Sequence, residues 1–132
     1  MSKAVPKICI IDYGMGNLRS VINALEYTVK CDVCISNEKR DLDSSDILIL
    51  PGVGSFNDAI GNLRERDLFD KLDNEVINRK KPLMAICLGM QIVMESSEEG
   101  GLSQGFGWIP GSVTRFQAPN EYRVPHMGWD NI

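Results

Sequence analysis

Three short runs of purely apolar residues constrain the fold of this chain more than any other feature. They are Ile8–Ile11, Ile47–Leu50 and Leu83–Ile86, and no charged or hydrogen-bonding side chain other than a cysteine thiol interrupts them. A strand with one solvated face alternates apolar and polar residues, whereas a strand of a parallel sheet is covered on both faces and is apolar throughout. The three runs therefore predict buried strands of a parallel sheet.

Segments with helical periodicity separate the runs. Apolar residues recur at three- and four-residue spacing between Asn17 and about Lys30, which predicts an amphipathic helix. Ser55 is a suitable N-cap for a helix to about Leu63. The remaining predicted elements are a strand over Cys31–Ser36, a polar connection over Asp41–Ser45, and a helix over Asp67–Arg79 with Leu68, Phe69, Leu72, Val76 and Ile77 inward. This order predicts one α/β domain over residues 1–132, a mostly parallel sheet with helices on both faces.

Cys87 follows the third apolar run directly, and a helix predicted to end near Met94 or Glu95 follows it. A strand, a sharp turn and a helix in this order are typical of a nucleophile elbow, which exposes one reactive side chain at the tip of the turn. Gly89 leaves space for the tight turn. The positive end of the helix dipole favours a thiolate at such a position. The alternative is a structural cysteine at the end of a core strand.

Two further turns follow strands and are expected at the same edge of the sheet, where α/β proteins bind ligands. Pro51-Gly52-Val53-Gly54 can turn backbone N–H groups into a pocket, as an oxyanion hole requires, with the N–H of Leu88 as a second donor. The alternative is a plain strand-to-helix turn. Gly14-Met15-Gly16-Asn17 resembles a dinucleotide fingerprint, but Arg19 stands in place of its third glycine. We therefore expect no dinucleotide there.

The other polar residues favour structural interpretations. His126 is the single histidine and could form a dyad with Cys87, but its neighbours favour packing or surface contact. Cys31 and Cys34 have CxxC spacing, but they point to opposite faces of a strand and lack further ligands for zinc. We therefore expect no metal and no cofactor. A cluster of glutamates, Glu95, Glu98 and Glu99, is expected to be a solvated patch.

The overall composition excludes several classes of partner. The formal net charge is −4 and no basic patch is present, so we expect no nucleic acid partner. No apolar stretch has the length of a membrane span, and the start of the chain lacks the apolar region of a signal peptide. We therefore expect a cytoplasmic protein that does not bind membranes.

Four motifs together resemble one enzyme family. They are Asp12–Leu18, Pro51–Phe56, Cys87–Gln91 and Pro125–Trp129. In this order and spacing they are similar to those of the glutaminase subunits of imidazole glycerol phosphate synthase, which are class I, triad-type glutamine amidotransferases of flavodoxin-like fold. The Cys-x-Gly spacing is shared across class I, whereas Pro-Gly-Val-Gly and Pro-His-Met-Gly-Trp are more specific to this subunit.

The resemblance implies a mechanism and partners. Cys87 attacks the amide of glutamine and forms a thioester, and the ammonia passes to a (β/α)₈-barrel cyclase subunit in a heterodimer, for histidine biosynthesis. The resemblance also implies that Gly52, Val53, Gly54 and Leu88 form the oxyanion site. It implies that Gln91 contacts glutamine and that Asn17 and Trp129 lie at the subunit interface.

One departure from the family pattern matters for activity. The family's catalytic His and Glu lie in a His-Pro-Glu motif, which this sequence does not contain. The chain is similar to the N-terminal two-thirds of the family pattern, and we expect these 132 residues alone to lack glutaminase activity. Two alternatives remain open. One is a related subunit that supplies ammonia to a sugar amidotransferase in surface-polysaccharide synthesis, and the other is an inactive interface module.

Overall fold

A four-stranded parallel sheet forms the centre of the computed structural model, which describes residues 5–117, 119, 122–129 and 131. Its strands are β1 (Lys7–Ile11), β2 (Asp32–Ser36), β3 (Ile47–Leu50) and β4 (Leu83–Ala85), in the spatial order β2-β1-β3-β4. Every neighbouring pair is parallel. The prediction of a parallel sheet from the continuous apolar runs is therefore confirmed.

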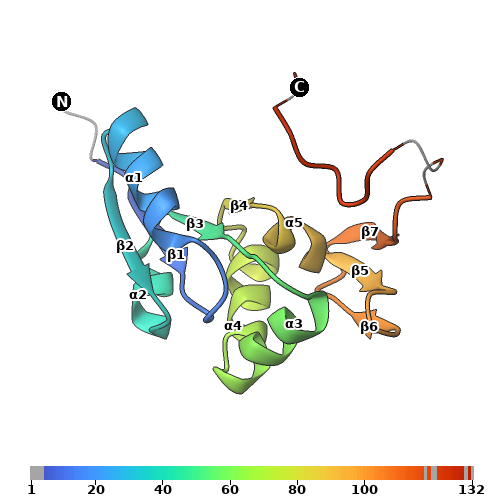
Figure 1. The fold of residues 1–132 in the computed structure, drawn as a ribbon. Coiled ribbons are helices and arrows are strands. Elements are labelled where there is room, and N and C mark those ends of the chain that lie inside the picture. Colours follow the sequence, from blue (N-terminus) through green and yellow to red (C-terminus); the bar gives the residue numbers. More distant parts are fainter. Residues whose placement is uncertain (1–4, 118, 120–121, 130, 132) are drawn as a thin grey trace.

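Helices cover both faces of this sheet (Figure 1). Helix α1 (Leu18–Thr28) packs on Ile8, Ile10 and Ile49. The opposite face carries α2 (Lys39–Ser44), α3 (Phe56–Glu65), α4 (Phe69–Asp73) and α5 (Leu88–Ile92), whose apolar side chains pack around residues such as Cys9 and Leu48. Successive residues of β1 thus point into two different cores, which is why the strand is apolar throughout.

A second, small sheet packs beside α4 and α5. It consists of β5 (Met94–Ser97), β6 (Ser103–Gln104) and β7 (Ile109–Val113) in the order β6-β5-β7. Phe106 stacks between Phe69 and Trp108, with ring centroids 4.2 Å and 4.1 Å apart. The indole N–H of Trp108 donates to Asp73 at 2.8 Å. These aromatic contacts fix the small sheet to α4.

Three predicted elements differ from the structure. The polar connection over Asp41–Ser45 is wrong, because α2 occupies this segment and buries Leu42. The helix that was expected to run to Met94 or Glu95 ends at Ile92, because Met94 already pairs with β7. The helix predicted over Asp67–Arg79 is α4 followed by a π-helical turn, η1 (Asn74–Asn78).

The π-helical turn changes which side chains are buried. Ile77, predicted to face inward, is 38% exposed, whereas Glu75 is fully buried. Ion pairs with Lys71 (2.7 Å), Arg79 (2.8 Å) and Lys81 (2.8 Å) surround the Glu75 carboxylate. Burial by itself raises the pKa of Glu75, but hydrogen bonds from these three cations outweigh it and lower the pKa to about 2. Glu75 is therefore the buried anionic centre of an ionic network that reaches the surface at Arg79.

The described part of the chain contains no helix that is both long and apolar enough to cross a membrane. It also contains no group of three or more His, Cys, Asp or Glu side chains placed to hold a metal ion. Cys31 and Cys34 belong to the cores on opposite faces of the sheet, as their strand spacing predicts, and both thiols are free.

Candidate functional site

The turns that follow β1, β3 and β4 meet at the carboxyl edge of the parallel sheet. A Cβ atom added to Gly52 would overlap the hydroxyl of Tyr13 and would lie 2.9 Å from Leu88 Cβ and 3.0 Å from Gly89 N. One added to Gly16 would lie 3.4 Å from Pro51. Segments from three separate strands are therefore in contact here, as the parallel topology predicts.

Cys87 occupies a strained turn between β4 and α5. Its backbone has φ 55° and ψ −113°, a conformation that side-chain-bearing residues rarely adopt. The side chain is exposed. The hydrogen bonds Gly89 N–H to Ile86 O (3.0 Å) and Gln91 N–H to Cys87 O (3.1 Å) hold the turn on both sides. A strained, exposed nucleophile between a strand and a helix is what an elbow provides.

Gly89 makes this turn possible, although its own φ is not positive. A Cβ at Gly89 would overlap the carbonyl oxygen of Leu50 and would lie 2.8 Å from the Leu50 carbonyl carbon. The same oxygen accepts the N–H of Ile86 at 3.0 Å, which ties the end of β4 to β3. Only glycine allows α5 to start this close to β3, so the predicted role of Gly89 in the tight turn is confirmed.

The loop Pro51–Gly54 begins inside the protein and ends at its surface. Pro51 and Gly52 are buried, Val53 is 56% exposed, and Gly54 has φ 109°. The loop continues into α3, where the Ser55 hydroxyl accepts the N–H of Asp58 at 3.2 Å. The predicted N-cap is thus present, and Gly52 lies directly against the start of α5 that follows Cys87.

Two glutamates of the predicted solvated cluster support backbone N–H groups instead of only facing water. The Glu99 carboxylate accepts the N–H of Phe56, the first residue of α3, at 3.0 Å. The Glu95 carboxylate accepts the N–H of Gly111 at 2.9 Å. Both residues remain exposed, as does Glu98. Glu99 thereby caps α3, the helix that follows the Pro51–Gly54 loop. The sequence does not predict this contact, because the two residues are 43 positions apart.

Tyr13 is the site residue that the sequence analysis missed. It is fully buried, and its hydroxyl donates to Pro51 O at 2.6 Å. Burial, and to a lesser extent the nearby charge of Cys87, together raise the pKa of Tyr13 to about 12. The hydroxyl therefore stays protonated and remains a donor. The one sequence signal was an aromatic residue at the end of a buried strand, directly before the glycine-rich turn.

The structure places the other predicted site residues as follows. Leu88 is buried as the first residue of α5, and the first N–H groups of a helix have no partner within it. Gln91 is half-buried on the same helix. Asn17 is exposed and caps α1 by accepting the N–H of Ser20 at 3.3 Å. Trp129 is fully exposed in the segment that follows the small sheet.

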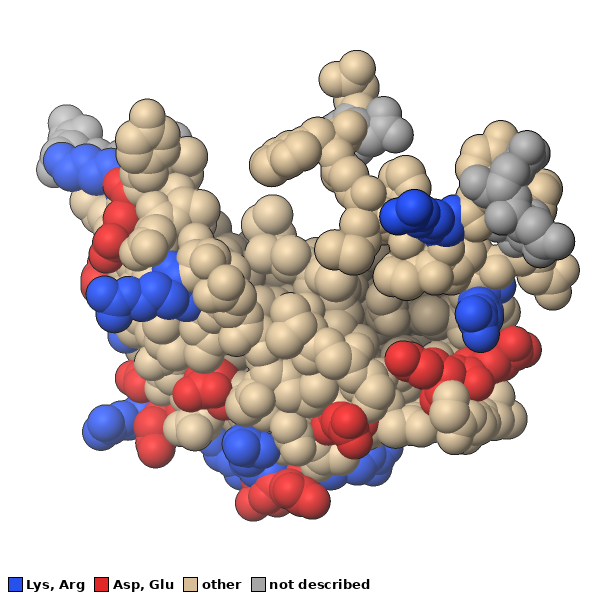
Figure 2. Space-filling view, in the orientation of Figure 1, with Lys and Arg blue, Asp and Glu red and all other residues tan. Residues whose placement is uncertain are grey.

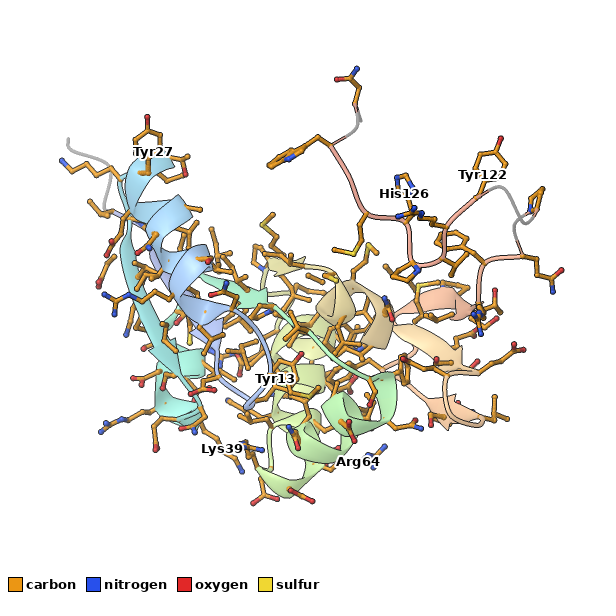
Figure 3. All side chains as sticks on the ribbon, viewed as in Figure 1. Tyr13, Tyr27, Lys39, Arg64, Tyr122 and His126 are labelled. Atoms are coloured by element: carbon orange, nitrogen blue, oxygen red, sulfur yellow. The ribbon has the colours of Figure 1, made fainter. Side chains whose placement is uncertain are left out.

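His126 lies apart from this arrangement. Figure 3 shows it on the outer segment that follows β7, whereas Tyr13 is inside the molecule between β1 and α3. His126 is exposed, and among the described residues no hydrogen bond or ion pair joins it to Cys87. Among the described residues, the exposed thiol of Cys87 thus lies near the Pro51–Gly54 loop and the start of α5, and His126 is not bonded to it.

The surface around the site carries little charge. Figure 2 shows a broad area without Lys, Arg, Asp or Glu in the centre of one face, between α1 and the small sheet. Val53, Met84 and Met90 are each more than half exposed. An exposed thiol at the start of a helix can attack an uncharged carbonyl group. Unpaired backbone N–H groups at such a position can stabilise the oxyanion that results.

Comparison with known proteins agrees with this geometry. A family model described as "Glutamine amidotransferase class-I" matches residues 9–130. A solved structure described as the crystal structure of a glutamine amidotransferase aligns with a TM-score of 0.61 at 20% identity, over 81% of this chain and 56% of that one. At this identity the match shows the fold alone. The expected flavodoxin-like α/β fold of class I amidotransferases is therefore confirmed.

Curated relatives are more similar in sequence. A Vibrio vulnificus protein named imidazole glycerol phosphate synthase subunit HisH 2 is 49% identical over 126 residues, covering 96% of this chain and 59% of that protein. A Geobacillus protein named subunit HisH of the same synthase is 48% identical over 129 residues (95% and 60%). A Campylobacter jejuni protein named subunit HisH 1 is 43% identical over 125 residues (95% and 62%). The chain thus spans about three-fifths of the length of these relatives.

Proposed function

Because the chain belongs to the class I glutamine amidotransferase family, we propose that it carries the nucleophile and oxyanion site of a glutaminase subunit of imidazole glycerol phosphate synthase. One observation supports this proposal most directly: Cys87 is exposed in a strained turn at the start of α5, close to the buried Gly52. The relatives named as subunits of that synthase, at 43–49% identity, support the choice of pathway.

The proposed chemistry begins at the thiolate of Cys87. The thiolate attacks the side-chain amide carbon of glutamine, and the carbonyl electron pair moves onto oxygen. The N–H of Leu88 and an N–H of the Gly52–Gly54 loop bind that oxyanion. The C–N bond then breaks, and the nitrogen takes a proton and leaves as ammonia. Water hydrolyses the glutamyl thioester, which releases glutamate and restores the thiol.

Two parts of this mechanism rest on the resemblance. Gln91, half-buried one turn after Cys87, is assigned to contact the bound glutamine. The proton transfers require a base, and we assign it to a His–Glu pair of the family type because His126 does not contact the thiol. The relatives named as HisH subunits are longer than this chain.

The proposed partner is a (β/α)₈-barrel cyclase subunit, which forms a heterodimer with this subunit in the cytoplasm. The cyclase subunit receives the ammonia. Asn17 and Trp129 are assigned to its interface, and both are exposed. Transfer inside the complex keeps the ammonia from being protonated in bulk water. The cyclase would combine it with the ribonucleotide substrate to form imidazole glycerol phosphate for histidine biosynthesis.

The test uses the intact natural protein together with its cyclase. Imidazole glycerol phosphate formation is measured with glutamine and, separately, with a high concentration of ammonium salt. The Cys87→Ala variant should lose the glutamine-dependent rate and keep the ammonium-dependent rate. Glutamine-dependent synthesis that persists in this variant would contradict the proposal. Co-purification with a sugar amidotransferase in place of a cyclase would move the subunit to surface-polysaccharide synthesis.

A further inference from the structure

The loop that supplies the oxyanion donors is held at its first residue by a buried side chain from a different strand. The Tyr13 hydroxyl donates to the carbonyl oxygen of Pro51 at 2.6 Å. Tyr13 is fully buried and Pro51 is buried, so water does not compete for this bond. Leaving the Pro51 carbonyl without its donor would therefore carry a desolvation penalty.

The same hydroxyl also limits where the next residue can lie. The Tyr13 hydroxyl, Leu88 Cβ and Gly89 N together leave no space for a Cβ atom at Gly52. The peptide unit is planar, and its C=O and N–H point in opposite directions. A bond that fixes the Pro51 carbonyl therefore also fixes the direction of the Gly52 N–H.

The other end of the loop is held by a second, independent contact. The Glu99 carboxylate accepts the N–H of Phe56, and the Ser55 hydroxyl caps α3. Between the two anchors, Val53 is 56% exposed and Gly54 has a backbone conformation that favours glycine. The short stretch Gly52–Gly54 is thus held at both of its ends.

We propose that Tyr13 is a positioning residue of the oxyanion site, whose hydroxyl holds the Pro51 carbonyl so that the N–H donors of Gly52–Gly54 face the carbonyl group attacked by Cys87. The proposal rests on the glutaminase function proposed above. Tyr13 acts through the loop and does not touch the substrate. Its hydroxyl stays protonated at working pH, because burial and the Cys87 charge oppose its ionisation. It is therefore a donor throughout turnover.

The test is Tyr13→Phe in the intact enzyme with its synthase partner, with Tyr27→Phe as the matched control. Phe keeps the ring and removes only the hydroxyl. Tyr27 is 92% exposed at the far end of α1, away from the site (Figure 3). A donor misplaced by a fraction of an ångström lowers turnover steeply. We expect kcat for glutamine hydrolysis to fall roughly 10- to 100-fold in Tyr13→Phe, with KM for glutamine within about twofold. Tyr27→Phe should match the unmodified enzyme.

A second measurement separates positioning from folding. The rate of Cys87 alkylation by iodoacetamide reports the thiol, and that reaction forms no oxyanion. We expect the rate in Tyr13→Phe to stay within about twofold of the unmodified rate. The rate of glutamine hydrolysis is divided by the amount of alkylatable Cys87, so misfolded protein does not count.

Three results are decisive. A hydrolysis rate per alkylatable thiol that is equal in Tyr13→Phe and Tyr27→Phe overturns the positioning role. A loss of alkylation in parallel with hydrolysis also overturns it, because the hydroxyl would then serve the fold of the elbow. Absence of glutamine hydrolysis in the unmodified complex contradicts the proposed function itself and is thereby distinguished from failure of the positioning role.

Discussion

Replacing Gly89 by Ala should damage the turn that presents Cys87, and the structure allows the cost to be worked out. The new Cβ would overlap the Leu50 carbonyl oxygen, which also accepts the Ile86 N–H at 3.0 Å. Overpacking a tight contact costs about 1–3 kcal/mol. Moving α5 away would weaken that buried hydrogen bond, which costs about 1–2 kcal/mol more. We therefore expect a loss of about 2–5 kcal/mol in the free energy of unfolding.

Gly61→Ala is the matched control, because it adds the same methyl group in the same domain. A Cβ at Gly61 meets no atom within 4 Å, and the residue lies inside α3. Alanine in a helix interior is about 0.5–1 kcal/mol more favourable than glycine. Urea denaturation of both variants of the intact protein gives the two free energies. If Gly89→Ala is as stable as the unmodified protein, the close approach of α5 to β3 is wrong and so is the account of the elbow.

Three further outcomes follow from the ionic contacts. Glu75→Gln should cost about 3 kcal/mol or more in urea denaturation, because it removes the buried carboxylate that Lys71 and Lys81 share. A change below about 1 kcal/mol would contradict this. The pKa of Glu75 is about 2 in the folded protein and near 4.5 in the unfolded chain. The stabilisation that ionised Glu75 adds to the free energy of unfolding is therefore complete above pH 4.5 and disappears as the pH falls toward 2. A pH series that shows the unmodified protein and Glu75→Gln losing stability in parallel over that range would refute the assignment. Glu99→Gln should lower the melting temperature slightly, because it weakens the contact of Glu99 with the start of α3, which is worth about 0.5–1 kcal/mol. The control Glu98→Gln should leave the melting temperature unchanged. Equal melting temperatures of the two variants would contradict the capping role of Glu99.

The parts of the fold that the sequence predicts are those with a local cause. Continuous apolar runs predict β1, β3 and β4, and apolar periodicity predicts α1. Apolar periodicity does not predict α2, because this helix is short and buries a single residue, Leu42, within a polar stretch. The same pattern does not predict that the π-helical turn buries Glu75, because the charge of Glu75 is balanced by Lys81, which approaches only in the folded protein.

The candidate site divides in the same way. Cys87, Gly89 and the Pro51–Gly54 loop carry local signatures, since each lies where an apolar strand meets a turn. Tyr13 does not, because the role proposed for it depends on a hydrogen bond to a residue 38 positions away. The capping role of Glu99 depends likewise on a contact 43 positions away. The interface assigned to Asn17 and Trp129 stays a prediction.

The most direct test of the account is the covalent labelling of Cys87 by an electrophilic glutamine analogue in the intact complex. The labelled protein is digested, and the modified peptide is identified by mass spectrometry. We predict one adduct, on Cys87, whose formation free glutamine slows, with Cys9, Cys31 and Cys34 unmodified. An adduct on another cysteine, or full glutaminase activity after stoichiometric labelling of Cys87, would contradict its role as the nucleophile.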